Sequence, residues 1–262
     1  MPRKSPPLRN LAFKRPKPID GDGDGASGAM NPLLNGILAA LPKEEYKRLL
    51  PHLHFVDLEL KQALYKSGDR VQHGYFPVSG MVSLVVALGS GDDVEVAIIG
   101  RDGFGGSPLL LGGSVSPYQA VVQGQGGAFR IKGDALVRAV DRNPRLRQLL
   151  HQHLQFEAAQ MSQSAACLRF HSVEERLARW LLTTQDRLGS EFLPLTHEFL
   201  AQMLGANRST VTLVARVLQS AGLIRYSRGQ VAILDREGLE NVSCECYQTV
   251  RKYKDMLLPD SR

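Results

Sequence analysis

The stretch from Phe104 to Gly113 has the sequence FGGSPLLLGG, and its glycines allow a backbone to approach an anion closely. A turn of this kind binds phosphate when its amides converge on one point and side chains complete the site. The residues placed to do so are Gly105, Gly106 and Ser107, but Pro108 removes one amide donor. Two interpretations stay open, a phosphate-binding turn and a turn that has lost that role.

A second set of residues, between Thr196 and Ile224, has the types that bind DNA. Thr196 and Asn207 are N-cap candidates for two helices, and Gly205 fits the turn between them. Small or apolar residues fall where two such helices must pack together, at Leu200, Ala201, Leu204, Ala206, Val211 and Val214. This is the spacing of a helix-turn-helix.

The second of these helices carries side chains that bind base edges and phosphates. The DNA-binding candidates are Thr196, Asn207, Arg208, Ser209, Thr210, Thr212 and Arg216, with Arg225 and Arg228 on a β-hairpin, or wing, predicted from GLIRYSRGQVAIL. The segment from Phe199 to Leu234 contains four arginines and no acidic residue, which favours a polyanionic partner. For any one of these residues, a solvated polar surface is the alternative.

The elements before this region must position it. Short apolar runs such as GMVSLVVAL, VEVAIIG and GAFRI are separated by turn residues between Phe55 and Ile131, at intervals of about 8 to 15 residues. This pattern predicts an antiparallel β-roll of the jelly-roll type rather than a parallel sheet. Two short helices are expected before the β-roll, over residues 31–50.

The run from Arg145 to Leu168 contains neither Pro nor Gly and predicts a helix about 36 Å long, with Pro144 in its first turn. A mixed stripe along it consists of Leu146, Leu149, Leu150, His153, Phe156, Gln160 and Ser164. A helix of this length between two folded parts is expected to pair with its own copy, which makes the protein a homodimer. The alternative is a helix that only packs on the β-roll.

The fold class is therefore predicted as α+β, in five segments. These are a disordered basic tail (1–30), a β-roll sensor domain (31–142), a dimerisation helix (143–169), a winged helix-turn-helix (170–238) and a C-terminal helical extension (239–262). The first 20 residues of the tail contain six Lys or Arg and one acidic residue, Asp20, which gives them a net charge of +5. Its DGDGDG sequence resembles the start of a calcium loop, but Asn31 stands where the loop needs Glu, so we interpret it as a linker.

Composition limits the classes of function. The 262 residues carry a formal charge of +6, and 43% are hydrophobic, without a run of the length that a membrane span needs. The basic start is not followed by an apolar stretch, so it is not a secretory signal. With three cysteines only, we expect a cytoplasmic protein without disulfides and without a membrane partner.

In this order of parts, residues 40–238 resemble the Crp/Fnr family of bacterial transcription regulators, and SVEERLARWLL resembles the first helix of the family's DNA-binding domain. The resemblance implies a homodimer on a pseudo-palindromic promoter site in double-stranded DNA, with RNA polymerase as a candidate partner. Arg208 holds the place of the family's guanine-binding Arg. Ser209 and Leu213 replace an acidic residue and a second Arg of nucleotide-sensing members, and Leu213 would contact a thymine methyl.

The same resemblance bears on FGGSPLLLGG. Nucleotide-binding members have a turn of the form F-x-G-E-L, whose Glu binds ribose, and a later Arg–Ser pair that closes on the phosphate. In this chain Ser107 stands at the Glu position, and Tyr118 and Gln119 stand at the Arg–Ser positions. We therefore expect a degraded effector pocket, formed by Gly105, Gly106, Ser107, Tyr118 and Gln119, that does not bind cyclic nucleotide.

The cysteines do not predict a metal site or an iron–sulfur cluster, so no cofactor is expected. Cys167 lies alone on the long helix, and Cys244 and Cys246 would point about 200° apart on one predicted helix. Inert cysteines are the expectation, and a redox pair is the alternative. His52, His54 and His73 leave a haem or metal site as a further alternative.

We find no motif of an enzyme, such as a Walker loop or a Ser-His-Asp order, and expect no catalytic activity. Three other interpretations stay open. The β-roll could gate DNA binding through an unidentified ligand, a haem or metal, or a redox signal. The chain could be a cupin-like module with a nucleic-acid tether. The basic tail could bind nucleic acid without sequence preference.

Overall fold

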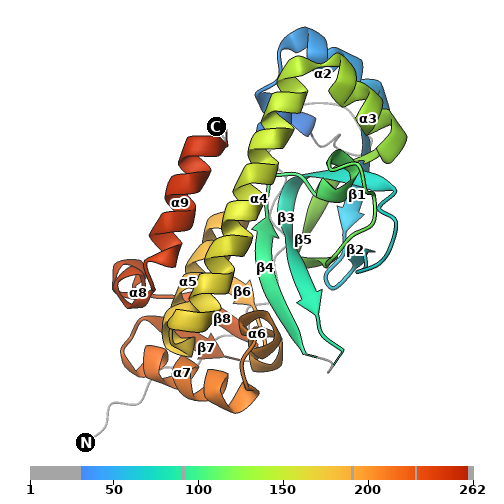
Figure 1. The fold of residues 1–262 in the computed structure, drawn as a ribbon. Coiled ribbons are helices and arrows are strands. Elements are labelled where there is room, and N and C mark those ends of the chain that lie inside the picture. The colour runs from blue at the N-terminus through green and yellow to red at the C-terminus, as the bar shows by residue number, and fades with distance from the viewer. Residues whose placement is uncertain (1–30, 90–91, 190–191, 228, 259–262) are drawn as a thin grey trace, which may run out of the picture.

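The computed structural model describes residues 31–89, 92–189, 192–227 and 229–258, and the predicted disordered tail lies outside them. Figure 1 shows a β-rich lobe and a helical lobe, with one long helix, α4, running between them. This architecture confirms the predicted α+β class, with an antiparallel sheet first and a helix-turn-helix after it.

The first lobe begins with short helices and continues as a five-stranded antiparallel sheet. The helices are η1 (Pro32–Leu34), α1 (Gly36–Ala39), α2 (Lys43–Leu49) and η2 (Leu50–His52). The strands are β1 (His54–Leu58), β2 (Ala63–Tyr65), β3 (His73–Ala87), β4 (Asp93–Ile99) and β5 (Gln119–Lys132), with η3 (Ser107–Leu110) before β5. Their order is β1-β5-β3-β4, and β2 also pairs with β5.

Two pairs of predicted strands are single strands in the structure. Strand β3 runs for 15 residues and β5 for 14, where the sequence predicted a break in each. The strands bend at irregular pairings near Ser79 instead of ending there. Gly80 makes this bend possible, because its φ is +79° and a Cβ atom there would lie 2.4 Å from the Gly124 carbonyl oxygen.

The β-roll is closed on one side by α3 (Gly133–Arg142) and α4 (Pro144–Phe170). Pro144 occupies the first turn of α4, as predicted. Every residue of the predicted stripe on α4 is buried. Part of the stripe packs with Phe76, Phe104 and Phe129 of the β-roll in one apolar core. The stripe is therefore covered by its own chain, and a partner copy would have to use another face of α4.

The second lobe holds α5 (Val173–Leu188), β6 (Phe192–Pro194), α6 (His197–Leu204), α7 (Arg208–Ser220), β7 (Ile224–Ser227) and β8 (Gln230–Ile233). Ser172 and Glu175 form a capping box that starts α5 directly after α4 ends. The sheet order is β6-β8-β7, so the predicted wing has a third strand that the sequence did not indicate. Helices α8 (Arg236–Val242) and α9 (Cys246–Leu257) follow, and α9 lies beside α4 (Figure 1).

Two buried carboxylates join the lobes. Asp102, in the loop after β4, pairs with Arg187 of α5 and with Nζ of Lys254 of α9, the latter at 3.1 Å. Burial alone would raise the pKa of Asp102, but these two cations lower it to about 2. Asp102 therefore stays ionised, and its two ion pairs connect the β-roll to α5 and α9.

Glu95 of β4 makes the second link. It accepts hydrogen bonds from Trp180 Nε1 of α5 at 2.8 Å and from Ser83 Oγ of β3 at 2.5 Å. Burial raises the pKa of Glu95 to about 7, although both hydrogen bonds act in the opposite direction. A carboxyl group in the contact between lobes therefore titrates near neutral pH.

This titration predicts how stability depends on pH. Between pH 4.5 and about 7, folded Glu95 keeps a proton that the unfolded chain releases, so the free energy of unfolding falls as pH rises through this window. The loss from this group amounts to at most about 3 kcal/mol. Urea unfolding at pH 5 and pH 8 should show a smaller loss for Glu95→Gln than for wild type. The exposed control Glu59→Gln should behave as wild type, and equal losses in all three would contradict the assignment.

Candidate nucleic-acid interface and effector pocket

Helices α6 and α7 form the predicted helix-turn-helix. Leu200, Ala201, Leu204 and Val211 are buried between them, and Ala206 and Val214 pack against the same core. Gly205 ends α6 with a φ of +54°, and its N–H donates to the carbonyls of Ala201 and Gln202. A left-handed residue at this position turns the chain so that α7 crosses over α6.

One face of α7 is left exposed. Arg208, Ser209 and Arg216 lie on it, and Thr210 is half-buried beside them. Asn207 occupies the N-cap position of α7, but its side chain makes no capping hydrogen bond. Asn207 is exposed and leaves the amide groups of the first turn without a side-chain cap, and an exposed helix N-terminus of this kind suits an anion.

Two further DNA-binding candidates, Thr196 and Arg225, lie outside α7. Thr196 is exposed, and its hydroxyl accepts from the Phe199 N–H at 3.2 Å, which caps α6 as predicted. Arg225 is exposed on β7, while Arg228 lies outside the described residues. Strands β7 and β8 pair in antiparallel register, which confirms the predicted hairpin.

Thr212 is engaged within the protein. Its hydroxyl lies 2.9 Å from the Arg208 carbonyl oxygen and 2.9 Å from Nδ1 of His197. The His197 ring stacks on Tyr226 of the wing, with ring centroids 4.1 Å apart. Burial, followed by the charges of Arg208 and Arg216, lowers the pKa of His197, so the ring is neutral at pH 7. Thr212 thus links α7 to the wing through a histidine that sequence reasoning missed.

An acidic side chain of α6 pairs with the exposed face of α7, and two apolar side chains of α7 are exposed as well. Glu198, directly before the acid-free segment, lies 3.5 Å from the Arg208 guanidinium, and both side chains are mostly exposed. An exposed pair of this kind is worth little, so Arg208 can exchange it for another anion. Leu213 and Val217 are 62% and 46% exposed one turn apart on α7. They offer methyl groups between the polar side chains.

The backbone of the turn in the predicted effector pocket requires a glycine at position 106. Gly106 has a φ of +124°, and a Cβ atom there would lie 3.0 Å from Cα of Gly74. After it, Ser107 and Pro108 start the short helix η3. Gly106 therefore serves the geometry of the turn itself.

A carboxylate from α4 contacts two residues of the predicted effector pocket. Glu157 is 5% exposed, and it accepts hydrogen bonds from Ser107 Oγ at 2.6 Å and from Tyr118 Oη at 2.7 Å. Burial and the Glu157 charge raise the pKa of Tyr118, so its hydroxyl keeps the proton that it donates. Gln119 lies at the start of β5, where it pairs with Val85. Two residues that replace the expected ligand anchors thus bind the chain's own anion.

His153 completes this buried network. Its Nε2 lies 2.8 Å from the Phe104 carbonyl oxygen and 3.7 Å from Glu157 Oε2. Burial lowers the pKa of His153, so the ring is neutral, and its Nε2 lies within hydrogen-bond distance of both the N–H and the carbonyl oxygen of Phe104. The role of Glu157 was missed in the sequence, although it is the one acidic residue in the α4 segment.

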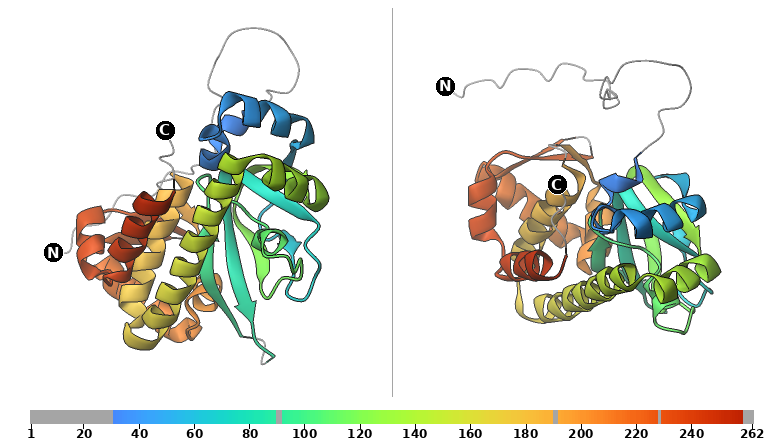
Figure 2. Two further views of the ribbon diagram at one scale, coloured as in Figure 1. Left: turned by 45° about the horizontal axis from the view of Figure 1, so that its top comes forward. Right: turned by 90° about the horizontal axis from the view of Figure 1, so that it is seen from above.

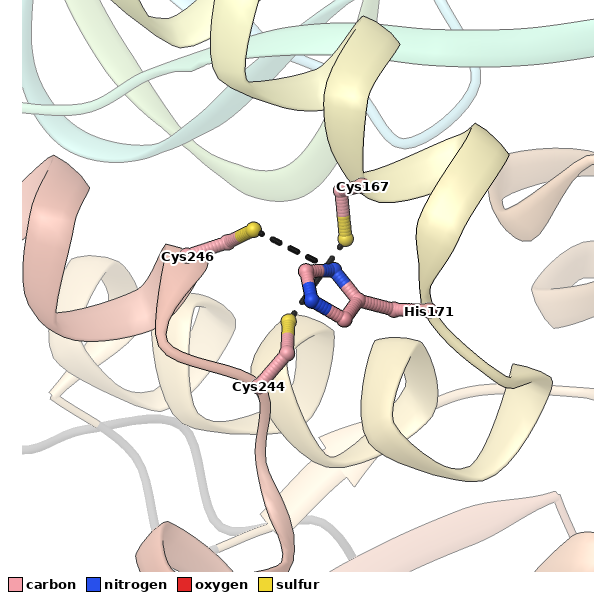
Figure 3. A group of neighbouring side chains, drawn as sticks. All are labelled: Cys167, His171, Cys244 and Cys246. Atoms are coloured by element: carbon pink, nitrogen blue, oxygen red, sulfur yellow. Dashed lines mark hydrogen bonds between the residues drawn. The ribbon is translucent and has the colours of Figure 1, made fainter.

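The predicted placement of the cysteines is wrong. Cys244 precedes α9 in a non-helical turn and Cys246 starts that helix, so the two are not on one helix and need not point apart. Their sulfurs meet Cys167 and His171, and the four ligand atoms lie within 4.8 Å of one another (Figure 3). Among the described residues, the histidines His52, His54 and His73 form no such group.

None of the helices in the described ranges is long and apolar enough to cross a bilayer.

Two family models match the chain and together cover more than half of it. Residues 55–143 match the cyclic nucleotide-binding domain, and residues 175–242 match the Crp-like helix-turn-helix domain. The first range covers the β-roll and α3 except for the first residue of β1, and the second covers α5 to α8 except for the first two residues of α5.

Similar proteins include the "Global nitrogen regulator" of Synechococcus elongatus, 24% identical over 192 residues that span 70% of this chain and 86% of that one. The "CRP-like cAMP-activated global transcriptional regulator" of Mycobacterium tuberculosis is 24% identical over 211 residues, 78% of this chain and 94% of the relative. The solved structure of the c-di-GMP-responsive global regulator CLP of Xanthomonas campestris has a TM-score of 0.63 at 19% identity, over 73% of this chain and 99% of that chain. This last likeness shows the fold.

The buried pocket network yields a prediction. Tyr118→Phe should lower the free energy of unfolding by about 1.5–3 kcal/mol, because Glu157 loses one of its two hydroxyl donors while it stays buried. Tyr253→Phe, at an exposed tyrosine of α9, is the matched control and should change it by less than about 0.5 kcal/mol. Urea unfolding of both variants measures the difference, and equal midpoints would show that the Tyr118–Glu157 contact contributes nothing.

Proposed function

The chain belongs to the Crp/Fnr family of transcriptional regulators, and on this basis we propose that it is a homodimeric, sequence-specific DNA-binding regulator whose β-roll does not bind cyclic nucleotide. The observation that carries the proposal is the exposed face of α7, where Arg208, Ser209 and Arg216 project from a helix that is firmly packed on α6. A helix held in this way can enter a major groove without deforming.

We assign the contacts to DNA by position on this surface. Arg208 and Ser209, at the start of α7, meet base edges, and the methyl groups of Leu213 meet thymine. Phosphates are bound by the other candidates, Thr196, Asn207, Thr210, Arg216, Arg225 and Arg228. Thr212 contributes through His197, because its hydroxyl already has two partners within the protein.

A second stripe on α4 supports the dimer. Leu154, Ala158, Met161, Ala165 and Leu168 follow one another at alternating steps of four and three residues, and all are half-buried or exposed. This is the spacing of a two-stranded coiled-coil seam. In the right-hand view of Figure 2, α4 lies along the lower edge of the molecule. The C-terminal lobe and most of the β-roll lie above it, so one side of α4 faces outward. A partner copy that packs on this seam would place two α7 helices in successive major grooves, about 34 Å apart.

The pocket network supports the absence of cyclic-nucleotide binding. A cyclic phosphate would meet the Glu157 carboxylate where it needs a cation, and like charges at hydrogen-bond distance are strongly unfavourable. The M. tuberculosis relative is described as cAMP-activated and the X. campestris relative as c-di-GMP-responsive. In the present chain, Ser107 and Tyr118 in the same part of the fold bind the Glu157 carboxylate instead.

Arg208→Ala should weaken binding to a specific duplex by about 5- to 150-fold, because one base contact is lost while the helix-turn-helix core is untouched. Fluorescence anisotropy of a labelled duplex measures the affinity, and light scattering checks that the dimer mass is unchanged. Arg48→Ala, at an exposed arginine of α2, is the matched control and should bind as wild type. Unchanged affinity of Arg208→Ala would remove this residue from the interface.

Deleting residues 1–30 separates this proposal from binding through the basic tail. The truncated chain should keep its preference for the specific duplex over a scrambled one. Loss of all binding on truncation would instead identify the tail as the DNA-binding element.

A further inference from the structure

Three cysteines and one histidine meet where α4 ends. Cys167 lies in the last turn of α4, and His171 is the residue that caps it. Cys244 and Cys246, from the turn before α9 and its first residue, reach the same point from the C-terminal extension (Figure 3). The three cysteines are buried and His171 is half-buried. The cluster lies outside both the helix-turn-helix face and the effector pocket.

The distances fit a single tetrahedral ion. Zinc bonds of about 2.3 Å to sulfur and about 2.0 Å to nitrogen give ligand separations of about 3.8 Å between sulfurs and about 3.5 Å between sulfur and nitrogen. Cys167 Sγ lies 3.6 Å from Cys244 Sγ, and Cys246 Sγ lies 3.4 Å from Nδ1 of His171. An iron–sulfur cluster spreads its ligands over several irons and needs them farther apart.

The second ring nitrogen of His171 has the partner that a metal-binding histidine requires. Its Nε2 lies 3.1 Å from a carboxylate oxygen of Glu245, the residue between the two cysteines of the SCECY sequence. Donation from Nε2–H to this carboxylate leaves the Nδ1 lone pair directed at the sulfurs. Gln163 supports the opposite side, because its Nε2 donates to Cys246 Sγ at 3.0 Å.

Two arginines interact with the cysteines of the cluster. Arg176 is 8% exposed and interacts electrostatically with Cys167 and Cys244, and Arg179 interacts with the same two cysteines. Both side chains have a buried Nε without a hydrogen-bond partner. Three thiolates around a divalent ion leave one net negative charge, which nearby guanidinium groups stabilise in this buried place.

We propose that Cys167, His171, Cys244 and Cys246 bind one zinc ion per chain. The ion replaces the three thiol protons, which pass to solvent, and no electron is transferred. Because Cys167 and Cys244 are separated by 77 residues, the ion closes a long loop and ties the C-terminal extension to α4. His171 is followed directly by Ser172, the N-cap of α5, so the ion sits at the junction that sets the angle between α4 and the second lobe.

The test is the metal content of the full chain, purified without a polyhistidine tag under reducing conditions. Plasma mass spectrometry should find about one zinc per chain in wild type and less than about 0.1 in Cys244→Ser and His171→Ala. His151→Ala, at an exposed histidine of the same helix α4, is the matched control and should keep the ion. No DNA is involved in this assay, so its failure would leave the proposed function standing.

Cobalt keeps the inference testable if the variants do not fold. Wild-type chain stripped by chelator and loaded with Co²⁺ should show thiolate-to-cobalt charge transfer in the near ultraviolet and the intense visible bands of a tetrahedral site. Wild type that lacks zinc and gives no such spectrum would overturn the proposal. So would iron in place of zinc, or a Cys167–Cys244 disulfide found by peptide mass mapping of the protein as purified.

Discussion

The packing of α4 against the β-roll is the constraint on which the other features depend. One face of this helix closes the apolar core through Leu146, Leu149 and Leu150, and the same register brings Glu157 to Ser107 and Tyr118 of the predicted effector pocket. A second face meets α9 and carries Cys167, and a third presents the heptad stripe that starts at Leu154. A shift of α4 by one turn would disturb all three together, because they lie on one rigid element.

Glu157 supplies a negative charge to the predicted effector pocket from within the chain. In a sensor that binds an anion, the ligand brings the negative charge that orders the pocket. In this chain the Glu157 side chain carries that charge. Ser107 and Tyr118 are therefore satisfied without a ligand, and the position of α4 on the β-roll is fixed by the chain itself. Asp102 and Glu95 extend the same principle to the contact between lobes, where buried carboxylates join α5 and α9 to the β-roll.

The sequence predicted what depends on local pattern and missed what depends on distant partners. The helix-turn-helix and α4 follow from periodicity, a turn glycine and the absence of Pro and Gly, all visible within a short window. The cysteine cluster joins residues 77 apart in the chain, and its prediction failed because a helix was assumed across a turn. Glu157 was missed because its donors, Ser107 and Tyr118, lie 50 and 39 residues away. Strand β6 was missed because three residues carry little pattern.

We propose that this chain recognises a specific DNA sequence and that it does so without cyclic nucleotide. Selection of binding sites from random duplex DNA, by purified protein with no ligand present, tests it most directly. The account predicts recovery of a two-fold-symmetric motif whose half-sites are centred about 10 base pairs apart. Recovery of no motif, together with binding that fades steeply as salt is raised, would contradict it.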